Sequence, residues 1–256
     1  MIDTLHTCAL GPTRYRDGLA LMDALVAARA AGETGDWLLY PDHEPVLTVG
    51  RSPSEGNVRV DASTLAHHGI EVVEVPRGGD VTWHGPGQLV GYPVVQLDRV
   101  DRDLHRWLRV LEDALIAALA GFGLEGRRVA GRTGVWLSET EKIASIGVAV
   151  RRWVGYHGFA LNVANTLDDF ALINPCGYRD IRMTSMVERL GARSPALNEV
   201  RSAVTAELAL RLGFQGVREH PPGDLRTVAG IARMADTSKQ WAAGNASRPI
   251  QGANAW

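Results

Sequence analysis

Lysine is scarce in this chain of 256 residues, where only Lys142 and Lys239 accompany the arginines among 27 basic side chains. The 29 acidic side chains bring the formal net charge to −2, so no overall field would attract nucleic acid or an anionic membrane. Any basic surface must be local. Because arginine is used almost everywhere else, the retained Lys142 favours a need for an amine that can lose its proton, which arginine practically cannot do.

Cysteine is also rare. Cys8 and Cys176 are far apart, and neither belongs to a Cys-x-x-C pair. This arrangement excludes the disulfide framework of a very small protein and disfavours a metal knuckle. The histidines lack a recognisable ligand spacing as well. We therefore expect no metal and no cofactor.

Long apolar runs are missing. The longest nearly uncharged run, 114–124, is interrupted by two glycines and is well short of the roughly 20 residues that cross a bilayer. The first residues, MIDTLHTCAL, contain no basic segment ahead of an apolar stretch, unlike a secretory signal. We therefore expect a cytoplasmic protein without a membrane partner.

The composition that is present, 45% apolar and 22% charged, is that of a globular protein with a sizeable core. From about Met234 the residues become small and polar, with weak periodicity. We predict one domain over 1–233, which would carry any catalytic residues, and a flexible or peripheral tail over 234–256.

Apolar periodicity predicts helices over 13–31, 103–122 and about 198–212. In the second of these, the apolar stripe begins at Leu104 and Asp103 is the expected N-cap. The clearest predicted strands cover 37–40, 45–50, 70–75, 89–97, 133–137, 142–150 and 156–163.

Prolines and connections refine this interpretation. Pro41 divides the first two strands, and Pro93 indicates an edge strand or a bulge. The segment 77–88 is predicted as a loop, and the last three strands as an antiparallel meander. Without regular alternation of strand and helix, we predict an α+β fold with a mixed β-sheet core and flanking helices.

The glycine-rich segment RGGDVTWHGPGQ at 77–88 is the first candidate site. Its glycines let the backbone approach a ligand closely, and Arg77 could orient a carbonyl or phosphate, although RGG alone fits a tight turn equally well. The extension adds Trp83, His84 and Gln88 within a short, rigid stretch. This density of polar groups favours a binding site.

Lys142 and Cys176 are the candidates for chemistry. Lys142 begins the strand KIASIGVAV, where it is either a strand-end lysine that reaches solvent or a titratable amine. Cys176 lies in an N-P-C-G turn, which favours an accessible nucleophile if a cation is close enough to stabilise the thiolate. Lys142, His84 and His157 are candidates for that cation, whereas Cys8 is interpreted as a small buried side chain.

In their order along the chain, RGGDVTWHGPGQLVGYP, KIASIGVAV, YHGFALNV and NPCG resemble the lipoyl(octanoyl) transferases of the biotin/lipoate protein ligase superfamily. The resemblance covers roughly 35–190 and rests on a specific combination of motifs. It implies a biotin/lipoate protein ligase-like fold and an octanoyl-[acyl-carrier-protein]:protein N-octanoyltransferase. Such an enzyme takes octanoyl from acyl carrier protein and places it on a lysine of a lipoyl domain.

The resemblance also implies roles for individual residues. Cys176 matches the nucleophile that accepts the acyl group, and Lys142 matches the lysine that lowers its pKa. The implied acceptors are lipoyl-domain proteins of 2-oxoacid dehydrogenase complexes and the glycine cleavage H protein. The segments that match the lining of the acyl substrate contain Arg77, Gly78, Gly79, Asp80, Val81, Thr82, Trp83, His84, Ser145, Ile146, Gly147, Gly158, Phe159 and Ala160.

The expected chemistry is a two-step acyl transfer that needs no ATP, because the donor thioester supplies the driving force. Backbone N–H groups near Gly78, Gly79 or Gly147 could form the oxyanion hole, and His84 could orient substrate or Lys142. An ATP-dependent lipoate or biotin ligase is the first alternative, although such a ligase needs no cysteine. The second alternative is a non-catalytic module that binds an acyl carrier.

Overall fold

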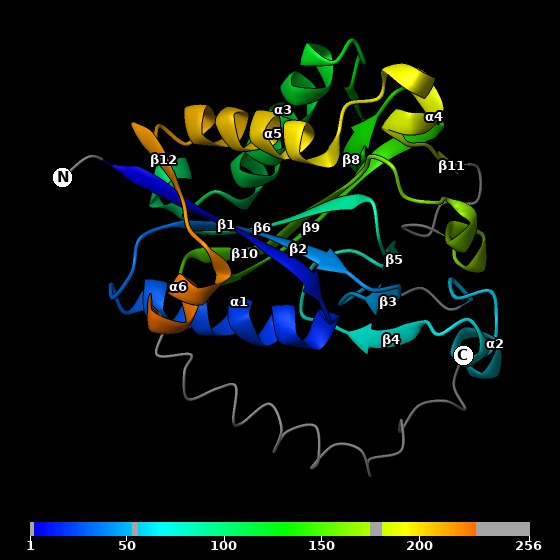
Figure 1. Ribbon diagram of the computed structural model, residues 1–256, viewed down its shortest axis with the longest axis horizontal. Helices are drawn as coiled ribbons and strands as arrows, with labels where there is room; N and C mark the ends of the chain where they lie inside the picture. Colours follow the sequence, from blue (N-terminus) through cyan, green and yellow to red (C-terminus); the bar gives the residue numbers. More distant parts are fainter. Residues whose placement is uncertain (1–2, 53–55, 175–180, 229–256) are drawn as a thin grey trace.

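The computed structural model describes residues 3–52, 56–174 and 181–228 (Figure 1). Cys176 and the predicted tail over 234–256 lie outside these ranges. Among the residues described, no helix combines the length and apolar character needed to span a membrane.

A mixed β-sheet forms the centre of the fold, as predicted. In spatial order its strands are β12 (Gly216–Glu219), β1 (Thr4–Thr13), β2 (Trp37–His43), β6 (Gln88–Gln96), β10 (Val154–Asn162), β9 (Glu141–Arg151), β8 (Arg132–Trp136) and β7 (Arg127–Val129). β1 pairs in parallel with both neighbours, and the ladders from β2 to β7 are antiparallel. The predicted meander corresponds to β8, β9 and β10. A short strand, β11 (Arg182–Met183), pairs in parallel with the start of β9.

A second, smaller sheet consists, in spatial order, of β4 (Glu71–Glu74), β3 (Val46–Val49) and β5 (Val81–His84). The short helix α2 (Ala62–His67) lies beside this sheet (Figure 1). β5 lies inside 77–88, so the prediction of a continuous loop there was wrong. The residues VTW favour a strand, and β5 pairs with β3 in antiparallel register from Val46 and His84 to Val49 and Val81.

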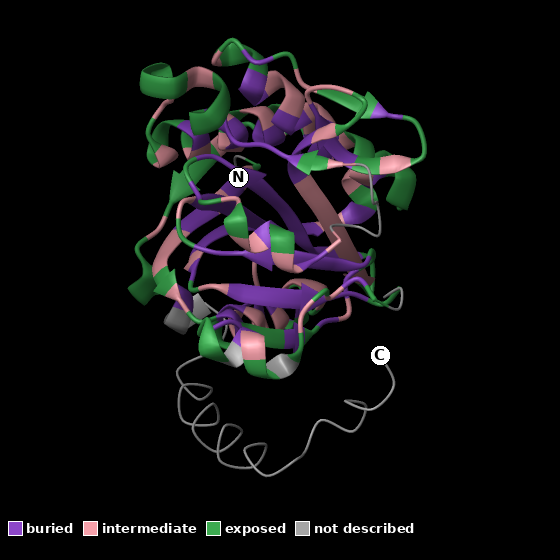
Figure 2. Cartoon of the chain, turned by 90° about the vertical axis from the view of Figure 1, so that its right-hand side faces the viewer, coloured by how far each residue is buried: buried purple, intermediate pink, exposed green. Residues whose placement is uncertain are grey.

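Helices cover both faces of the large sheet. α3 (Leu104–Gly121) and α5 (Leu197–Arg211) lie over one face, and α1 (Tyr15–Ala30) and α6 (Pro222–Val228) lie over the other (Figure 1). The sheet is buried, whereas the outer surfaces of the helices are exposed (Figure 2). The short elements η1 (Leu97–Val100), η2 (Asp168–Leu172), α4 (Met186–Leu190) and η4 (Gly191–Arg193) occupy the connections.

The predicted helices are observed as α1, α3 and α5. Asp103 is the N-cap of α3, where its carboxylate accepts hydrogen bonds from the backbone N–H groups of His105 and Arg106, at 2.8 and 3.2 Å. Leu104, however, was wrongly predicted to begin the buried stripe, because its side chain is 44% exposed. It lies in the first turn of the helix, and burial begins one turn later at Trp107.

Pro93 lies in the interior of the large sheet, so the expectation of an edge strand was wrong. β6 pairs with β2 on one side and with β10 on the other. The β6–β10 ladder has pairs up to Gly155 and from Phe159 onward, with the same register on both sides, so there is no bulge either. The unpaired stretch, 156–158, lies opposite Pro93, which has no N–H to donate. Pro41 also lies within a strand, because β2 continues to His43.

Candidate active site

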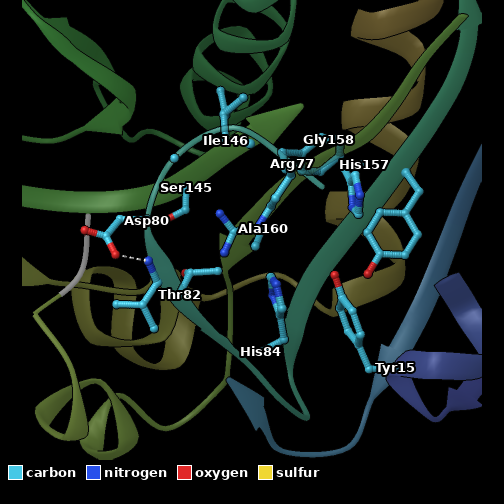
Figure 3. Close-up of a pocket in the computed structure, with 15 residues that line it drawn as sticks. Tyr15, Arg77, Asp80, Thr82, His84, Ser145, Ile146, His157, Gly158 and Ala160 are labelled. Carbon is cyan, nitrogen blue, oxygen red and sulfur yellow. Dashed lines mark hydrogen bonds between the residues drawn. The ribbon is translucent and has the colours of Figure 1, made fainter. Parts of the chain in front are cut away.

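A pocket with about 470 Å³ of empty space, counted to its open mouth, lies between β5 and the middle of the large sheet (Figure 3). Register explains why distant segments meet there: Gly147 pairs with Gly158, and Ser145 pairs with Ala160. The pocket is lined by Tyr15, Arg77, Gly79, Asp80, Val81, Thr82, His84, Tyr92, Ser145, Ile146, Gly147, His157, Gly158, Phe159 and Ala160.

The resemblance predicted a set of residues that line the acyl substrate. The structure brings all of them together around the pocket except Gly78 and Trp83. Trp83 is fully buried on the other side of β5, where its ring meets Phe170 at 5.5 Å between centroids, because alternate side chains of a strand point to opposite faces. Gly78 lies outside the pocket, and its N–H donates to the Val148 carbonyl at 2.8 Å. Neither residue lines the pocket, and their part in substrate binding stays a prediction. Gly78 is also removed as an oxyanion donor, which leaves Gly79 and Gly147.

Arg77 connects the glycine segment to the smaller sheet. Its buried guanidinium donates from Nη2 to the carbonyl and the hydroxyl of Thr48, both at 2.8 Å, and from Nη1 to the Gly78 carbonyl at 3.1 Å. Figure 3 shows this side chain reaching into the centre of the site. A rigidly bound arginine places a fixed positive charge beside the pocket.

The imidazoles of the site are neutral near pH 7. Burial, reinforced by His43, lowers the pKa of His84 to about 3, and its Nδ1–H donates to Gln88 Oε1 at 2.8 Å. Burial, reinforced by Arg77 and Arg51, also lowers the pKa of His157 to about 3. Neither histidine can therefore supply the cation that was expected beside Cys176. Lys142 is the remaining candidate.

Aromatic groups complete the pocket at the end near α1. The hydroxyl of Tyr92 donates to Nε2 of His43 at 2.7 Å, because His43 Nδ1–H is donated to the Thr13 carbonyl at 2.9 Å. The Tyr15 ring lies parallel to that of His84, with centroids 5.9 Å apart. Tyr15 and Tyr92 were missed as site residues, because their sequence signals indicate only a core helix face and a core strand.

His157 was considered in the sequence only as a candidate cation, yet it lines the pocket. It lies in the unpaired stretch of β10, with a backbone φ of 57° in the left-handed region. Its ring is 1% exposed, and among the described residues neither ring nitrogen has a hydrogen-bond partner. Pro93 is the signal that could have indicated this disturbed position.

Lys142 lies at the start of β9, beside the pocket-lining stretch Ser145–Gly147 but not in the pocket itself. Only 1% of it is exposed, so the interpretation as a solvent-reaching lysine was wrong. Its Nζ lies 5.1 Å from the centre of the Trp136 ring. Cys176 lies outside the described residues. The chain that follows it pairs with β9 directly at Lys142, through Met183.

The chain matches the family model of the lipoyl protein ligase A/B catalytic domain over residues 14–209. Octanoyltransferases from Geobacter metallireducens and Geobacter sulfurreducens are 49% and 47% identical to it over 217 and 200 residues. These matches cover 83% and 78% of this chain, and 98% and 81% of the two relatives. The chain belongs to the octanoyltransferase family. The resemblance identified from the motifs is thereby confirmed, and the protein is an enzyme of octanoyl transfer.

The fold of this octanoyltransferase is also that of more distant enzymes. A solved bi-partite lipoate protein ligase from Thermoplasma acidophilum superposes with a TM-score of 0.67 at 19% identity. The superposition covers 87% of this chain and 89% of that one. The predicted ligase-like α+β fold is therefore confirmed.

Substitutions of Gly79 test whether the pocket of the octanoyltransferase binds the acyl group. Gly79 has a φ of +87°, and a Cβ there would lie 3.6 Å from Arg77 Nη1. Gly79→Ala and Gly79→Val both strain this backbone, but only valine adds methyl groups that enter the pocket. We expect Gly79→Val to lower kcat/KM for the octanoyl donor by about tenfold relative to Gly79→Ala, or ~1.4 kcal/mol. Equal kcat/KM values, or losses that follow the melting temperature, would contradict an acyl-binding role.

Proposed function

We propose that this enzyme transfers octanoyl from acyl carrier protein to a lipoyl-domain lysine, through a thioester on Cys176. The observation that carries the proposal is the buried Lys142, which pairs through its backbone with the strand that follows the Cys176 segment. An ammonium close to a thiol favours the thiolate, which is the reactive form. Because His84 and His157 are neutral, Lys142 is the candidate for the cation that stabilises the Cys176 thiolate.

In the first step, the Cys176 thiolate attacks the donor carbonyl and forms a C–S bond. The tetrahedral intermediate then breaks its bond to the carrier's sulfur, which leaves as a thiolate and takes the proton of the Lys142 ammonium, so that Lys142 is neutral for the second step. Exchange of one thioester for another is nearly isoenergetic, so the enzyme's task is to activate the nucleophile and stabilise the oxyanion. Backbone N–H groups near Gly79 and Gly147 are the candidate donors to that oxyanion.

In the second step, the acceptor's lysine amine attacks the enzyme thioester and forms the C–N bond. The C–S bond breaks, Cys176 leaves as a thiolate, and the amine loses a proton to a base, for which Lys142 in its neutral form is the candidate. Amide formation from a thioester is downhill, so ATP is not needed. The proposed acceptors are lipoyl domains of 2-oxoacid dehydrogenase complexes and the glycine cleavage H protein.

The lining of the pocket supports an acyl chain as its occupant. Ala160 and the rings of Tyr15 and Tyr92 offer apolar surface, and each methylene that leaves water contributes about 0.8 kcal/mol. The acceptor class is supported by the bi-partite lipoate protein ligase of the same fold, which was described together with its E2 lipoyl domain.

Intact-mass analysis after incubation with octanoylated carrier protein, without ATP or magnesium, tests the proposal. We expect one octanoyl adduct, mapped by peptide mass to Cys176 and discharged when a lipoyl domain is added. Cys176→Ser should abolish this labile adduct. Cys8→Ser is the matched control and should retain it, because Cys8 is buried and burial raises its pKa to about 11. Strict dependence on ATP would support a ligase instead, and an adduct on Cys8 would contradict the mechanism.

A further inference from the structure

Gly134 of β8 forms the surface on which the end of the Lys142 side chain lies. A Cβ built on Gly134 would lie 2.7 Å from Lys142 Cε and 3.2 Å from Lys142 Nζ. Any side chain at this position would therefore collide with the Ala144 carbonyl oxygen, at 2.5 Å, and with the end of the Lys142 side chain. Gly134 also has a φ of +123°, which other residues rarely adopt. The place of the Lys142 ammonium thus depends on where the backbone of Gly134 is held.

The strand ladders around Gly134 are irregular. The β8–β9 ladder shifts register between Val135 and Trp136, one residue beyond Gly134. The β8–β7 ladder also shifts register, within the stretch of β8 from Arg132 to Trp136. Regular pairing is therefore interrupted close to this glycine on both sides of β8, and a further contact fixes its backbone.

That contact comes from helix α3. The N–H of Gly134 donates to Oε1 of Glu112 at 3.1 Å. The Glu112 carboxylate is 1% exposed, and its Oε2 accepts from Arg109 at 2.5 Å and from Arg128 at 2.8 Å. The two arginines offset the charge of the carboxylate and fix its orientation. Oε1 is thus a buried, oriented acceptor for the Gly134 N–H.

We propose that Glu112 is a positioning residue for Lys142, which it serves by holding the backbone of Gly134 under the lysine's ammonium. This inference rests on the proposed function of Lys142. Glu112 acts indirectly, through Gly134. Loss of the Glu112 carboxylate should therefore move the Lys142 ammonium away from the thiol that this ammonium activates. The effect should therefore appear as a change in the reactivity of Cys176.

The test measures the rate at which iodoacetamide alkylates Cys176 in the full-length enzyme as a function of pH, with the modified cysteine located by peptide mass. The variants are Glu112→Ala, Glu112→Gln, Lys142→Ala and the double variant Glu112→Ala with Lys142→Ala. Asp113→Asn is the matched control, because it removes the neighbouring carboxylate of α3, which pairs with Arg128, and leaves Glu112 and its bond to Gly134 in place. Circular dichroism and thermal melting check folding. If Glu112→Ala does not fold, the near-isosteric Glu112→Gln carries the test.

We expect Lys142→Ala to slow alkylation near pH 7 and to move its pH dependence upward. Glu112→Ala should do the same by about tenfold, and Glu112→Gln by less, because an amide can satisfy either Gly134 or the arginines with its oxygen. In the Lys142→Ala background, Glu112→Ala should add no further slowing. Asp113→Asn alone should leave the pH profile of alkylation unchanged.

Two results would overturn the positioning role while leaving the function of Lys142 intact. The first is a shift with Lys142→Ala but none with either Glu112 variant. The second is an equal effect of Glu112→Ala with and without Lys142, which would indicate general loosening of the fold. An unchanged profile for Lys142→Ala itself would instead refute the proposed function of Lys142, and the positioning role with it.

Discussion

Replacement of Lys142 by alanine is expected to slow octanoyl transfer by at least about a hundredfold, the lower end of the effect of a positioned acid or base. The side chain is buried and lies beside the ring of Trp136, away from bulk solvent. Alanine removes both the charge proposed to favour the Cys176 thiolate and the amine proposed to accept a proton. Even the first acylation, measured as adduct mass against time, should be slow.

Lys142→Arg separates these two roles. Arginine keeps the positive charge, but it cannot serve as a base for the incoming amine. The first acylation should therefore continue, to the extent that the larger guanidinium fits above Gly134, and the octanoyl enzyme should accumulate. Transfer by Lys142→Arg at the wild-type rate would exclude proton relay and leave only the charge. Wild-type transfer by Lys142→Ala would exclude both.

The second large effect is expected on stability in acid. The pKa of His157 is about 3 in the folded protein, against an ordinary value of 6.5. Between these values the unfolded chain binds a proton that the folded protein does not, so the contribution of His157 is complete above pH 6.5 and decreases as the pH falls toward 3. The decrease is about 1.4 kcal/mol per pH unit. As the pH falls from 6.5 to 4.5, protonation of His157 in the unfolded chain should thus lower the free energy of unfolding by roughly 2 kcal/mol.

His157→Asn isolates this contribution, because asparagine does not titrate and tolerates the left-handed backbone at this position. Urea unfolding at pH 6.5, 5.5 and 4.5 should show that the variant loses stability less steeply than the wild type. His84→Asn should reduce the slope similarly, and it should also lower stability at every pH because Gln88 loses its hydrogen-bond partner. Curves for His157→Asn that run parallel to the wild type would show that its imidazole is not held neutral.

The parts of the site that could be predicted from the sequence are those whose residues are contiguous. The stretches 77–84, 145–147 and 158–160 carry local motifs, and strand pairing brings the last two together as Gly147–Gly158 and Ser145–Ala160. That the side chain of Trp83 lies away from the pocket could not be predicted, because a motif does not show on which face of β5 a side chain lies. Tyr15 and Tyr92 were missed because their place at the pocket depends on how α1 packs against β6.

The same distinction applies to the fold. Helices α1 and α3 could be predicted because an apolar stripe repeats over many residues of each. Pro41 and Pro93 misled the assignment of strands because both lie where a ladder tolerates a missing N–H: the β1–β2 ladder shifts register next to Pro41, and the β6–β10 ladder is open opposite Pro93. Whether a ladder can accept a proline at a given position depends on how the strands pair in the folded protein. The identity of a single residue does not predict that pairing.

Strand β9 carries Lys142 at its start and the pocket residues Ser145–Gly147 further along. A strand advances about 3.3 Å per residue, so the backbone at Gly147 lies about 16 Å from that at Lys142 whatever the surrounding side chains do. In the proposed mechanism, the reacting end of the substrate and the cavity proposed for its tail are thereby kept at a spacing fixed by covalent bonds. Substitutions at Tyr15 or Tyr92 can change the depth of the cavity, but only an insertion or deletion in β9 can change that spacing, and one inserted residue would turn the pocket side of the strand away from its ligand.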